Sequence, residues 1–317
     1  MNILKDYIEN KFGIDESKFL EVLKMSPGAE GYLHGSISEL LFKDYMTDKG
    51  YEVLRIKEKP EGGYNAKSDD ARGDFYIRKI QNPEIDEWYV VENKGIKTNT
   101  EKHLFTLDTK DKLYNHLYTL AFPKEDVLEK AYNKGLKSYT TKKNEWESKN
   151  VGKEFPKFNW DKNTPGARAF NLIGYWDTKE ELRTWVDSLN DETLKTESYL
   201  NLEGPIRMIA THAPSNRTAP FTKIKQAAPL VTEFNIMCVD LFQRTGEHKF
   251  VFMNPLTISH SPTSPEHLYQ NYHIDYIIPG IKDSLRLSHP WYEDIEECIR
   301  LTNPIPRKID KSQLDGR

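Results

Sequence analysis

The chain has 317 residues, of which 37% are hydrophobic, 12% aromatic and 30% charged, and its formal net charge is −4. This composition is typical of a polar globular protein that buries a sizeable core, and it excludes an intrinsically disordered chain. The acidic balance argues against a protein that coats nucleic acid through a basic surface. A nuclease remains compatible with it, because an acidic metal site can offset basic grooves elsewhere.

Cysteine content and apolar runs exclude further classes. Cys238 and Cys298 form no C-x-x-C motif, so neither a disulfide scaffold nor a structural zinc site is expected, and a reducing intracellular, cytoplasmic setting fits best. The N-terminus lacks a signal-peptide pattern and no long apolar run occurs, so no membrane association is expected. The glycine motifs that bind phosphate groups of nucleotides are absent, so no nucleotide cofactor is expected.

The first part of the chain is predicted to run from helices into strands. Residues 2–25 have the apolar spacing of short amphipathic helices, which Ser26-Pro27-Gly28 interrupts. A longer helix is expected over residues 31–49, with Gly50 as its C-terminal cap. Strands separated by Gly-, Pro- or Asn-containing turns are then expected over residues 51–56, 74–80 and 88–94.

The middle of the chain is lysine-rich. A helix is expected over residues 104–120, followed by the weakly periodic stretch 124–163, which contains Lys142 and Lys143. We interpret this stretch as an exposed, mobile basic segment that contacts DNA or, because glutamates are interspersed, as a solvated face.

A mixed pattern of strands and helices resumes beyond this segment. Residues 230–242 are apolar and ambiguous between helix and strand. The other elements expected are strands over residues 170–176, 206–211, 249–253 and 274–278, and helices over residues 180–189 and 292–301.

Charged residues stand at the end of the apolar strand predicted over residues 88–94. Because side chains alternate along a strand, Glu92 and Lys94 point to the same face. Asp74 stands at the start of the preceding strand. Two carboxylates make a hard oxygen site suited to Mg²⁺, and a lysine beside them can hold a phosphate or position a water. These groups are what metal-assisted phosphodiester hydrolysis requires.

The triplet Glu-x-Lys by itself decides nothing. Other such triplets begin at Glu9, Glu16, Glu147 and Glu247. What distinguishes Glu92 is that it ends an apolar run expected to be a buried central strand, where charged groups are costly unless they are paired or bind a metal. A buried ion pair between Asp74 and Lys94 remains the alternative.

Taken in order, these motifs resemble the PD-(D/E)xK nuclease superfamily, which includes type II restriction endonucleases, Mrr-like enzymes and repair nucleases. The resemblance rests on a helix with Gly35 and Glu39, on Gly73-Asp74 and on Glu92-Asn93-Lys94, and it covers residues 31–120. The chain departs from the family pattern at Gly73, because the family has a proline before the first acid.

The resemblance implies a role for each of these residues. Asp74 and Glu92 would bind Mg²⁺ together with a backbone carbonyl near Asn93. Lys94 would contact the scissile phosphate and orient, or help to deprotonate, the attacking water. Glu39 would complete the site or hold a second metal through water. In-line attack would leave a 5′-phosphate and a 3′-hydroxyl.

The fold that follows is an α/β fold with a mixed central β-sheet flanked by helices, a restriction-endonuclease-like core and an additional α+β region for DNA recognition. We expect an N-terminal helical segment (1–30), the nuclease core (31–123), a basic linker or DNA-contacting segment (124–165) and the remainder of the sheet with the recognition region (166–317).

DNA recognition is expected to use Arg, Lys and Asn side chains, mostly outside the core. A loop over residues 212–218 and a second over residues 254–264 contain such residues, although polar loops contain them in any protein. His267 and His273 suggest a His-Asn-His nuclease only superficially, and we expect them to be structural. The candidate DNA contacts are Arg72, Lys97, Lys142, Lys143, Asn216, Arg217, Lys223 and Lys225.

The function expected from the sequence is a Mg²⁺-dependent type II restriction endonuclease that acts on double-stranded DNA. A homodimer is expected, because cutting both strands of a palindrome calls for two sites related by a twofold axis. Two alternatives remain open: a repair, Mrr-like or phage-type nuclease, and a non-catalytic DNA-binding protein on a nuclease-derived fold.

Overall fold

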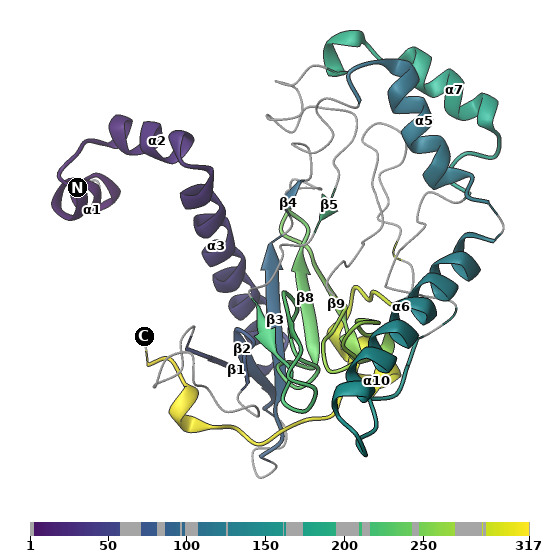
Figure 1. Ribbon diagram of the computed structural model, residues 1–317. Helices are drawn as coiled ribbons and strands as arrows, with labels where there is room; N and C mark the ends of the chain where they lie inside the picture. Colours follow the sequence, from purple (N-terminus) through teal and green to yellow (C-terminus); the bar gives the residue numbers. More distant parts are fainter. Residues whose placement is uncertain are drawn as a thin grey trace.

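The computed structural model describes residues 3–57, 71–80, 86–95, 97–98, 107–124, 126–160, 162, 174–194, 209–210, 216–242, 247–269, 287 and 290–316. Its centre is a five-stranded sheet (Figure 1) built from β1 (Tyr51–Arg55), β2 (Phe75–Lys79), β3 (Tyr89–Gly95), β8 (Ile236–Asp240) and β9 (Phe250–Met253). The strand order is β1-β2-β3-β8-β9, with β3 and β8 parallel and the other neighbours antiparallel. The expected α/β class with a mixed central sheet is therefore confirmed.

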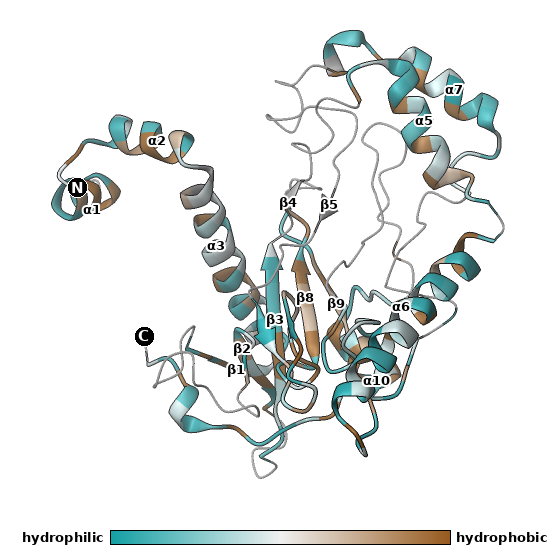
Figure 2. Ribbon diagram, viewed as in Figure 1, coloured by the Kyte–Doolittle hydropathy of each residue, from teal (hydrophilic) through white to brown (hydrophobic). Residues whose placement is uncertain are grey.

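β3 lies in the middle of the sheet because its first half is apolar on both faces. Val90 and Val91 are fully buried and belong to the cores on opposite faces of the sheet. Phe75 and Ile236 flank Val91 from the two neighbouring strands. Figure 2 shows that the C-terminal half of β3 is hydrophilic beside the hydrophobic β8. The prediction of a central strand that ends in charged residues is thus confirmed.

One face of the sheet is covered by α3 (Pro27–Asp48), which buries Phe42 and Met46 against β2 and β3. The long helix predicted here is confirmed, but it begins four residues earlier than expected. Of the predicted interruption Ser26-Pro27-Gly28, only Ser26 stands between α3 and the helix before it. Pro27 begins α3, because a proline at the first helical position has the required φ and has no N–H to satisfy. Gly50, at φ +78°, follows the helix as its predicted cap.

α1 (Ile3–Phe12) and α2 (Glu16–Met25) are the two short N-terminal helices that the apolar spacing predicts. They continue from the N-terminal end of α3 and stand away from the sheet (Figure 1). Large apolar side chains on them are exposed, among them Ile3, Leu20 and Met25.

α10 (Ile295–Thr302) packs on the same face of the sheet as α3, through Ile295 and Cys298. The helix predicted over residues 292–301 starts later, because the Asp294 carboxylate accepts hydrogen bonds from the backbone N–H groups of residues 296 and 297 and caps it. Cys238 and Cys298 are both buried free thiols.

Among the described residues, the core on the opposite face of the sheet is built from strands and from segments outside the α-helices. Tyr76, Val90, Met237 and Met253 pack there against Leu268, in a core that also includes Trp291. The C-terminal segment closes one side of this core, because the Tyr76 hydroxyl donates a hydrogen bond to the side chain of Gln313 at 2.8 Å.

α5 (Lys110–Ala121) and α7 (Lys179–Ser188) form a helix pair with a core of its own, beyond the end of the sheet (Figure 1). Both predicted helices are confirmed, although α5 begins only after Thr109, whose hydroxyl caps it. The predicted strand over residues 170–176 is wrong where the structure describes it. Gly174 has φ +71° in a turn, and Trp176 is buried against the helices. Residues 104–106 and 170–173 lie outside the described residues.

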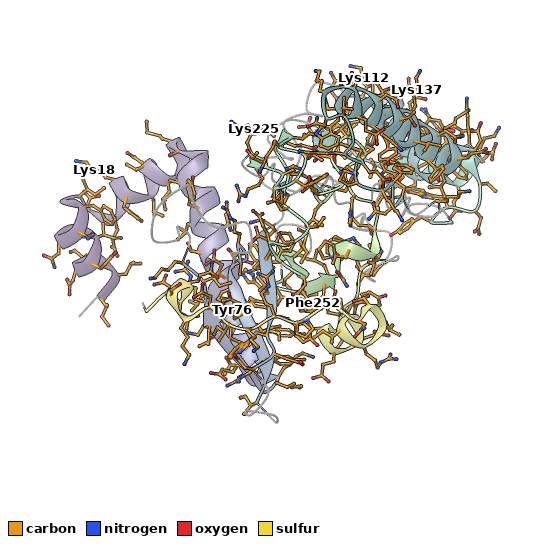
Figure 3. The ribbon with its side chains drawn as sticks, turned by 60° about the horizontal axis from the view of Figure 1, so that its bottom comes forward. Lys18, Tyr76, Lys112, Lys137, Lys225 and Phe252 are labelled. Atoms are coloured by element: carbon orange, nitrogen blue, oxygen red, sulfur yellow. The ribbon has the colours of Figure 1, made fainter. Side chains whose placement is uncertain are left out.

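The weakly periodic basic stretch forms the long helix α6 (Val127–Lys149). Lys130, Lys134, Lys137 and Lys149 are exposed on it, which agrees with the alternative of a solvated face. The buried residues of α6, Gly135, Tyr139 and Trp146, recur at helical spacing, but lysines between them hide the period. The Trp160 ring lies so close to Gly135 that a Cβ there would be 2.3 Å from it. Figure 3 shows Lys112 and Lys137 extending from the helices, far from Tyr76 and Phe252 of the sheet.

The remaining elements are short. Two strand pairs lie outside the central sheet: β4 (Lys97–Thr98) with β5 (Ile209–Ala210), and β6 (Arg217–Thr218) with β7 (Lys225–Gln226). Short 3₁₀ helices lie at η3 (Asp191–Leu194), η4 (Pro255–Thr257) and η5 (Lys311–Gln313).

The strand predictions for residues beyond 200 are confirmed in part. The ambiguous stretch 230–242 contains the strand β8, and the strand predicted over residues 249–253 is β9. The strand predicted over residues 206–211 is confirmed for β5, while its other residues and the strand predicted over residues 274–278 lie outside the described residues. Within the described ranges, no helix has the length and apolar character needed to cross a bilayer.

Candidate functional site

Asp74 and Glu92 lie close together on two neighbouring strands. Phe75 pairs with Val91 in the antiparallel register of β2 and β3, and Asp74 comes one residue before β2. The Asp74 N–H donates to the Val91 carbonyl at 2.8 Å, one residue out of that register. Both carboxylates line one cavity, and the charge of Glu92 helps to raise the pKa of Asp74. The expected pairing of an acid at a strand start with the acid on the central strand is therefore present.

Gly73 is required by how closely the chain approaches β3. A Cβ at this position would lie 2.6 Å from Val90 Cγ1 and 2.6 Å from the Val91 carbonyl oxygen. Neither distance is tolerable for a carbon atom, so no side chain fits without a shift of the backbone. The close approach thus gives a local steric reason for a glycine at this position.

Glu92 and Lys94 form an ion pair on the same face of β3, as the alternation predicts. Their side chains are 13% and 33% exposed, so the pair is largely withdrawn from solvent. Burial by itself lowers the pKa of Lys94, but the charges of Glu92 and Asp74 outweigh it and raise that pKa above its ordinary value. Lys94 is therefore held in its charged form.

The ionised form of the Asp74 carboxylate is disfavoured in this arrangement. Burial and the neighbouring charge of Glu92 raise its pKa well above the ordinary value, and Lys94 opposes them only in part. The Asn93 N–H donates to Asp74 Oδ2 at 2.7 Å and fixes the carboxylate in place. A site with two adjacent carboxylates and one ammonium has an excess of negative charge, which a bound cation would relieve.

Glu39 borders this site from α3. Its carboxylate accepts a hydrogen bond from Arg55 Nη2 at 2.7 Å, and Asp315 lies 3.5 Å from Nη1 of the same arginine. The charge of Glu39 contributes to raising the pKa of Asp74, so the two groups are electrostatically coupled. The structure thus brings Glu39 toward the site, although an arginine that the sequence did not single out engages its carboxylate.

The Asn93 side chain lies on the opposite face of β3 from Glu92 and Lys94. Its side chain is buried toward α3, where Asn93 Nδ2 donates to the Ser38 hydroxyl at 3.1 Å. This contact explains why a polar residue is tolerated between Glu92 and Lys94 on a central strand. Only the backbone of Asn93 faces the acidic pair, through its N–H group.

A cavity of about 190 Å³ opens beside Asp74 and Glu92. Arg72 and Arg217, two of the predicted DNA contacts, line it. Lys57 also lines it, which sequence reasoning missed. The Lys57 N–H donates to the Gln313 carbonyl of the C-terminal segment, a contact between distant parts of the chain that no local pattern signals. Acidic and basic groups from four separate parts of the chain thus share one opening.

The other predicted DNA contacts lie elsewhere. Lys142 and Lys143 are on α6, where they pair with Glu145 and Glu147 of the same helix. Asn216, Lys223 and Lys225 are exposed on or near the β6–β7 hairpin, and Figure 3 locates Lys225 apart from the α6 lysine Lys137. The side chain of Lys97 lies outside the described residues. Of the five residues in this group whose side chains are described, none lines the cavity.

The donor atoms at the site are those of two carboxylates. In the part of the chain that the structure describes, no group of three or more His, Cys, Asp or Glu side chains is arranged to hold a metal ion. Mg²⁺ keeps several waters and is commonly bound by one or two carboxylates plus substrate phosphate. The pair Asp74 and Glu92, with its excess of negative charge, fits that requirement.

Comparison with protein-family models, with curated proteins and with solved structures finds no match to this chain. The functional assignment therefore depends on the geometry and electrostatics of the site.

Proposed function

We propose that this chain is a Mg²⁺-dependent endonuclease that hydrolyses phosphodiester bonds of double-stranded DNA, with a restriction-endonuclease-like core of the PD-(D/E)xK superfamily. The observation that carries the proposal is that Asp74 and Glu92 line one cavity, with Lys94 paired to Glu92 on the same face of the central strand. The raised pKa of Asp74 supports it, because burial and then the charge of Glu92 disfavour the ionised carboxylate, and a bound divalent cation would offset that cost.

In this proposal Asp74 and Glu92 hold Mg²⁺. The bound ion would lower the pKa of a coordinated water and offset charge that develops on the phosphate. The Asn93 N–H keeps the Asp74 carboxylate oriented, and Arg55 keeps Glu39 beside the site, so we assign Glu39 a supporting role.

Lys94 is assigned to the phosphate and the attacking water. Because its neighbours raise its pKa, Lys94 stays protonated at neutral pH and can donate hydrogen bonds. It would therefore contact the scissile phosphate and orient the water, but it would not remove the proton from that water.

The specificity class is type II restriction, with a homodimer as the assembly that cuts both strands of a palindrome. A repair, Mrr-like or phage-type nuclease would use the same site with less sequence preference. A non-catalytic DNA-binding protein is the alternative of another class, in which Asp74, Glu92 and Lys94 would only be an ion-pair network.

Cleavage of plasmid or phage DNA with Mg²⁺ tests this proposal. Wild-type protein, Asp74→Asn and Glu92→Gln should be compared with Glu247→Gln, which changes an exposed glutamate of another Glu-x-Lys triplet. Discrete fragments from wild type and Glu247→Gln, abolished by EDTA and by either site variant, support a restriction enzyme. A smear with the same dependence indicates the less specific nuclease. DNA binding without cleavage by any of the proteins overturns the enzymatic assignment.

A further inference from the structure

The cavity beside the acidic pair has a second, basic wall. Arg72 lies two residues before Asp74, and Arg217 comes from β6, far along the chain. Both arginine side chains are only partly exposed, at 26% and 23%. Partly buried guanidinium groups at an opening are costly to maintain unless something holds them, so the basic wall requires a structural cause.

The cause is Glu233, a carboxylate that is only 3% exposed. Glu233 Oε1 accepts a hydrogen bond from Arg217 Nε at 2.6 Å and lies 3.5 Å from Arg72 Nε. Burial raises the pKa of Glu233, while both arginines act against that rise. One buried carboxylate thus orients two guanidinium groups, and the three side chains together carry a net positive charge.

The backbones of both arginines are also fixed. The Arg72 N–H donates to the Glu233 carbonyl at 3.0 Å. The Arg217 carbonyl lies 3.1 Å from His267 Nε2, and the buried His267 ring is held on its other side by Ser264. His267 therefore has a structural role, as expected, because it holds the backbone of Arg217 in place. Pre-organised arginines lose little conformational entropy when they bind an oxyanion.

We propose that Arg72 and Arg217 form a phosphate subsite that binds the backbone phosphate next to the one attacked at Asp74 and Glu92, and that Glu233 is the positioning residue of this subsite. The inference rests on the proposed nuclease function. Guanidinium groups match the geometry of phosphate oxygens. On a nucleic-acid strand, the anion nearest to the scissile phosphate is the next phosphate, and the shared cavity brings both groups of residues to it.

The first test is the salt dependence of DNA binding, measured with Ca²⁺ in place of Mg²⁺ on a plasmid fragment. Arg72→Gln and Arg217→Gln should each reduce the slope of log K against log salt by about 0.9, the loss of one phosphate contact. Arg183→Gln is the matched control, because Arg183 is an exposed arginine between two carboxylates on α5 and α7, and its slope should not change. Unchanged slopes in both cavity variants overturn the subsite.

The second test locates the phosphate. Once the cut position of wild-type protein is mapped, a duplex carrying a neutral methylphosphonate at the neighbouring position should bind wild type roughly tenfold more weakly. Arg72→Gln and Arg217→Gln should show no such penalty, because the contact is already absent. A penalty of equal size in wild type and variants overturns the assignment while leaving the nuclease intact.

The role of Glu233 is tested with the same pair of duplexes. Glu233→Ala removes no positive charge, yet it should abolish the methylphosphonate penalty, and Glu233→Asp, which keeps a carboxylate, should restore part of it. A purely structural Glu233 would lower stability and leave the penalty in place.

Two further outcomes separate this inference from the proposed function. If wild type neither cuts nor binds DNA, both fail. If inorganic phosphate protects wild type, but not the arginine variants, from thermal unfolding while DNA binding is unaffected by them, the ligand is free phosphate and the DNA subsite is overturned.

Discussion

Two Glu-x-Lys triplets of this protein form ion pairs in contrasting environments. Glu92 and Lys94 pair on the central strand at 13% and 33% exposure, whereas Glu247 and Lys249 pair at 3.0 Å beside β9 at 70% and 57% exposure. The middle residue of each is anchored, Asn93 by Ser38 and His248 by Asp240. The two triplets share their pattern and their pairing, so the pattern alone cannot distinguish them.

The difference lies in what surrounds each pair. An exposed ion pair contributes at most about 1 kcal/mol and is screened by salt. At the partly buried triplet, burial and the charge of Glu92 raise the pKa of Asp74, so the ionised form of Asp74 is disfavoured there. Strongly perturbed charges cluster at functional sites, so this difference is what the proposed function predicts.

The contrast between the two triplets is tested most strongly by replacing Lys94 and Lys249 in turn. Lys94→Met should lower the DNA cleavage rate by roughly a hundredfold to a thousandfold, because a charged group at the phosphate is lost. Lys249→Met should leave the rate within twofold, since its pair is solvated. Initial rates at saturating Mg²⁺ measure both. Equal losses in the two variants would refute the distinction between the triplets.

The close approach at Gly73 gives a second test, on stability. Gly73→Ala should destabilise the protein by about 1 to 3 kcal/mol, because its methyl group would overlap Val90 and the Val91 carbonyl. Gly95→Ala, at the other end of β3, meets no atom within 4 Å and should change little. Urea unfolding measures the difference, and a tolerated Gly73→Ala would show that the strands can move apart.

Asp74 gives a third test, through pH. In EDTA, Asp74→Asn should stabilise the protein at neutral pH. The folded protein raises the pKa of Asp74, so its ionisation destabilises the fold as pH rises from the ordinary value of 3.8 through the folded value. Below 3.8 both states are protonated and the gain should vanish. Thermal unfolding across pH measures it.

Asp44→Asn, on the exposed surface of α3, is the matched control for the change of aspartate to asparagine. Added Mg²⁺ should stabilise wild type and not Asp74→Asn. A gain of the same size at pH 3 would mean that the substitution acts through packing and not through charge.

The smallest expected effect concerns the anchor of Asn93. Ser38→Ala removes the hydroxyl that Asn93 contacts and should cost about 1 kcal/mol in the free energy of unfolding. Ser148→Ala, at an exposed hydroxyl of α6, should cost less. If both variants unfold at the same urea concentration as wild type, the anchor does not stabilise the central strand.

Much of the fold near the site could be predicted because its signals are local. Turn residues delimit β1, β2 and β3, and apolar spacing defines α3. α6 could not be recognised, because its lysines conceal an apolar stripe that packs against residues outside the helix, among them Phe155, Phe158 and Trp160. The turn at Gly174 was mistaken for a strand, because its aromatic residues are buried by helices and not by a sheet.

The sequence by itself determined that Glu92 and Lys94 share a face of an apolar strand and that Asp74 begins its neighbour, because side-chain alternation is a property of the backbone alone. Only the tertiary structure decided that Arg72, Arg217 and Lys57 meet these acids at one cavity and that Glu233 orients two of them. Contacts between residues far apart in the chain depend on how the whole core packs, and no local pattern encodes them.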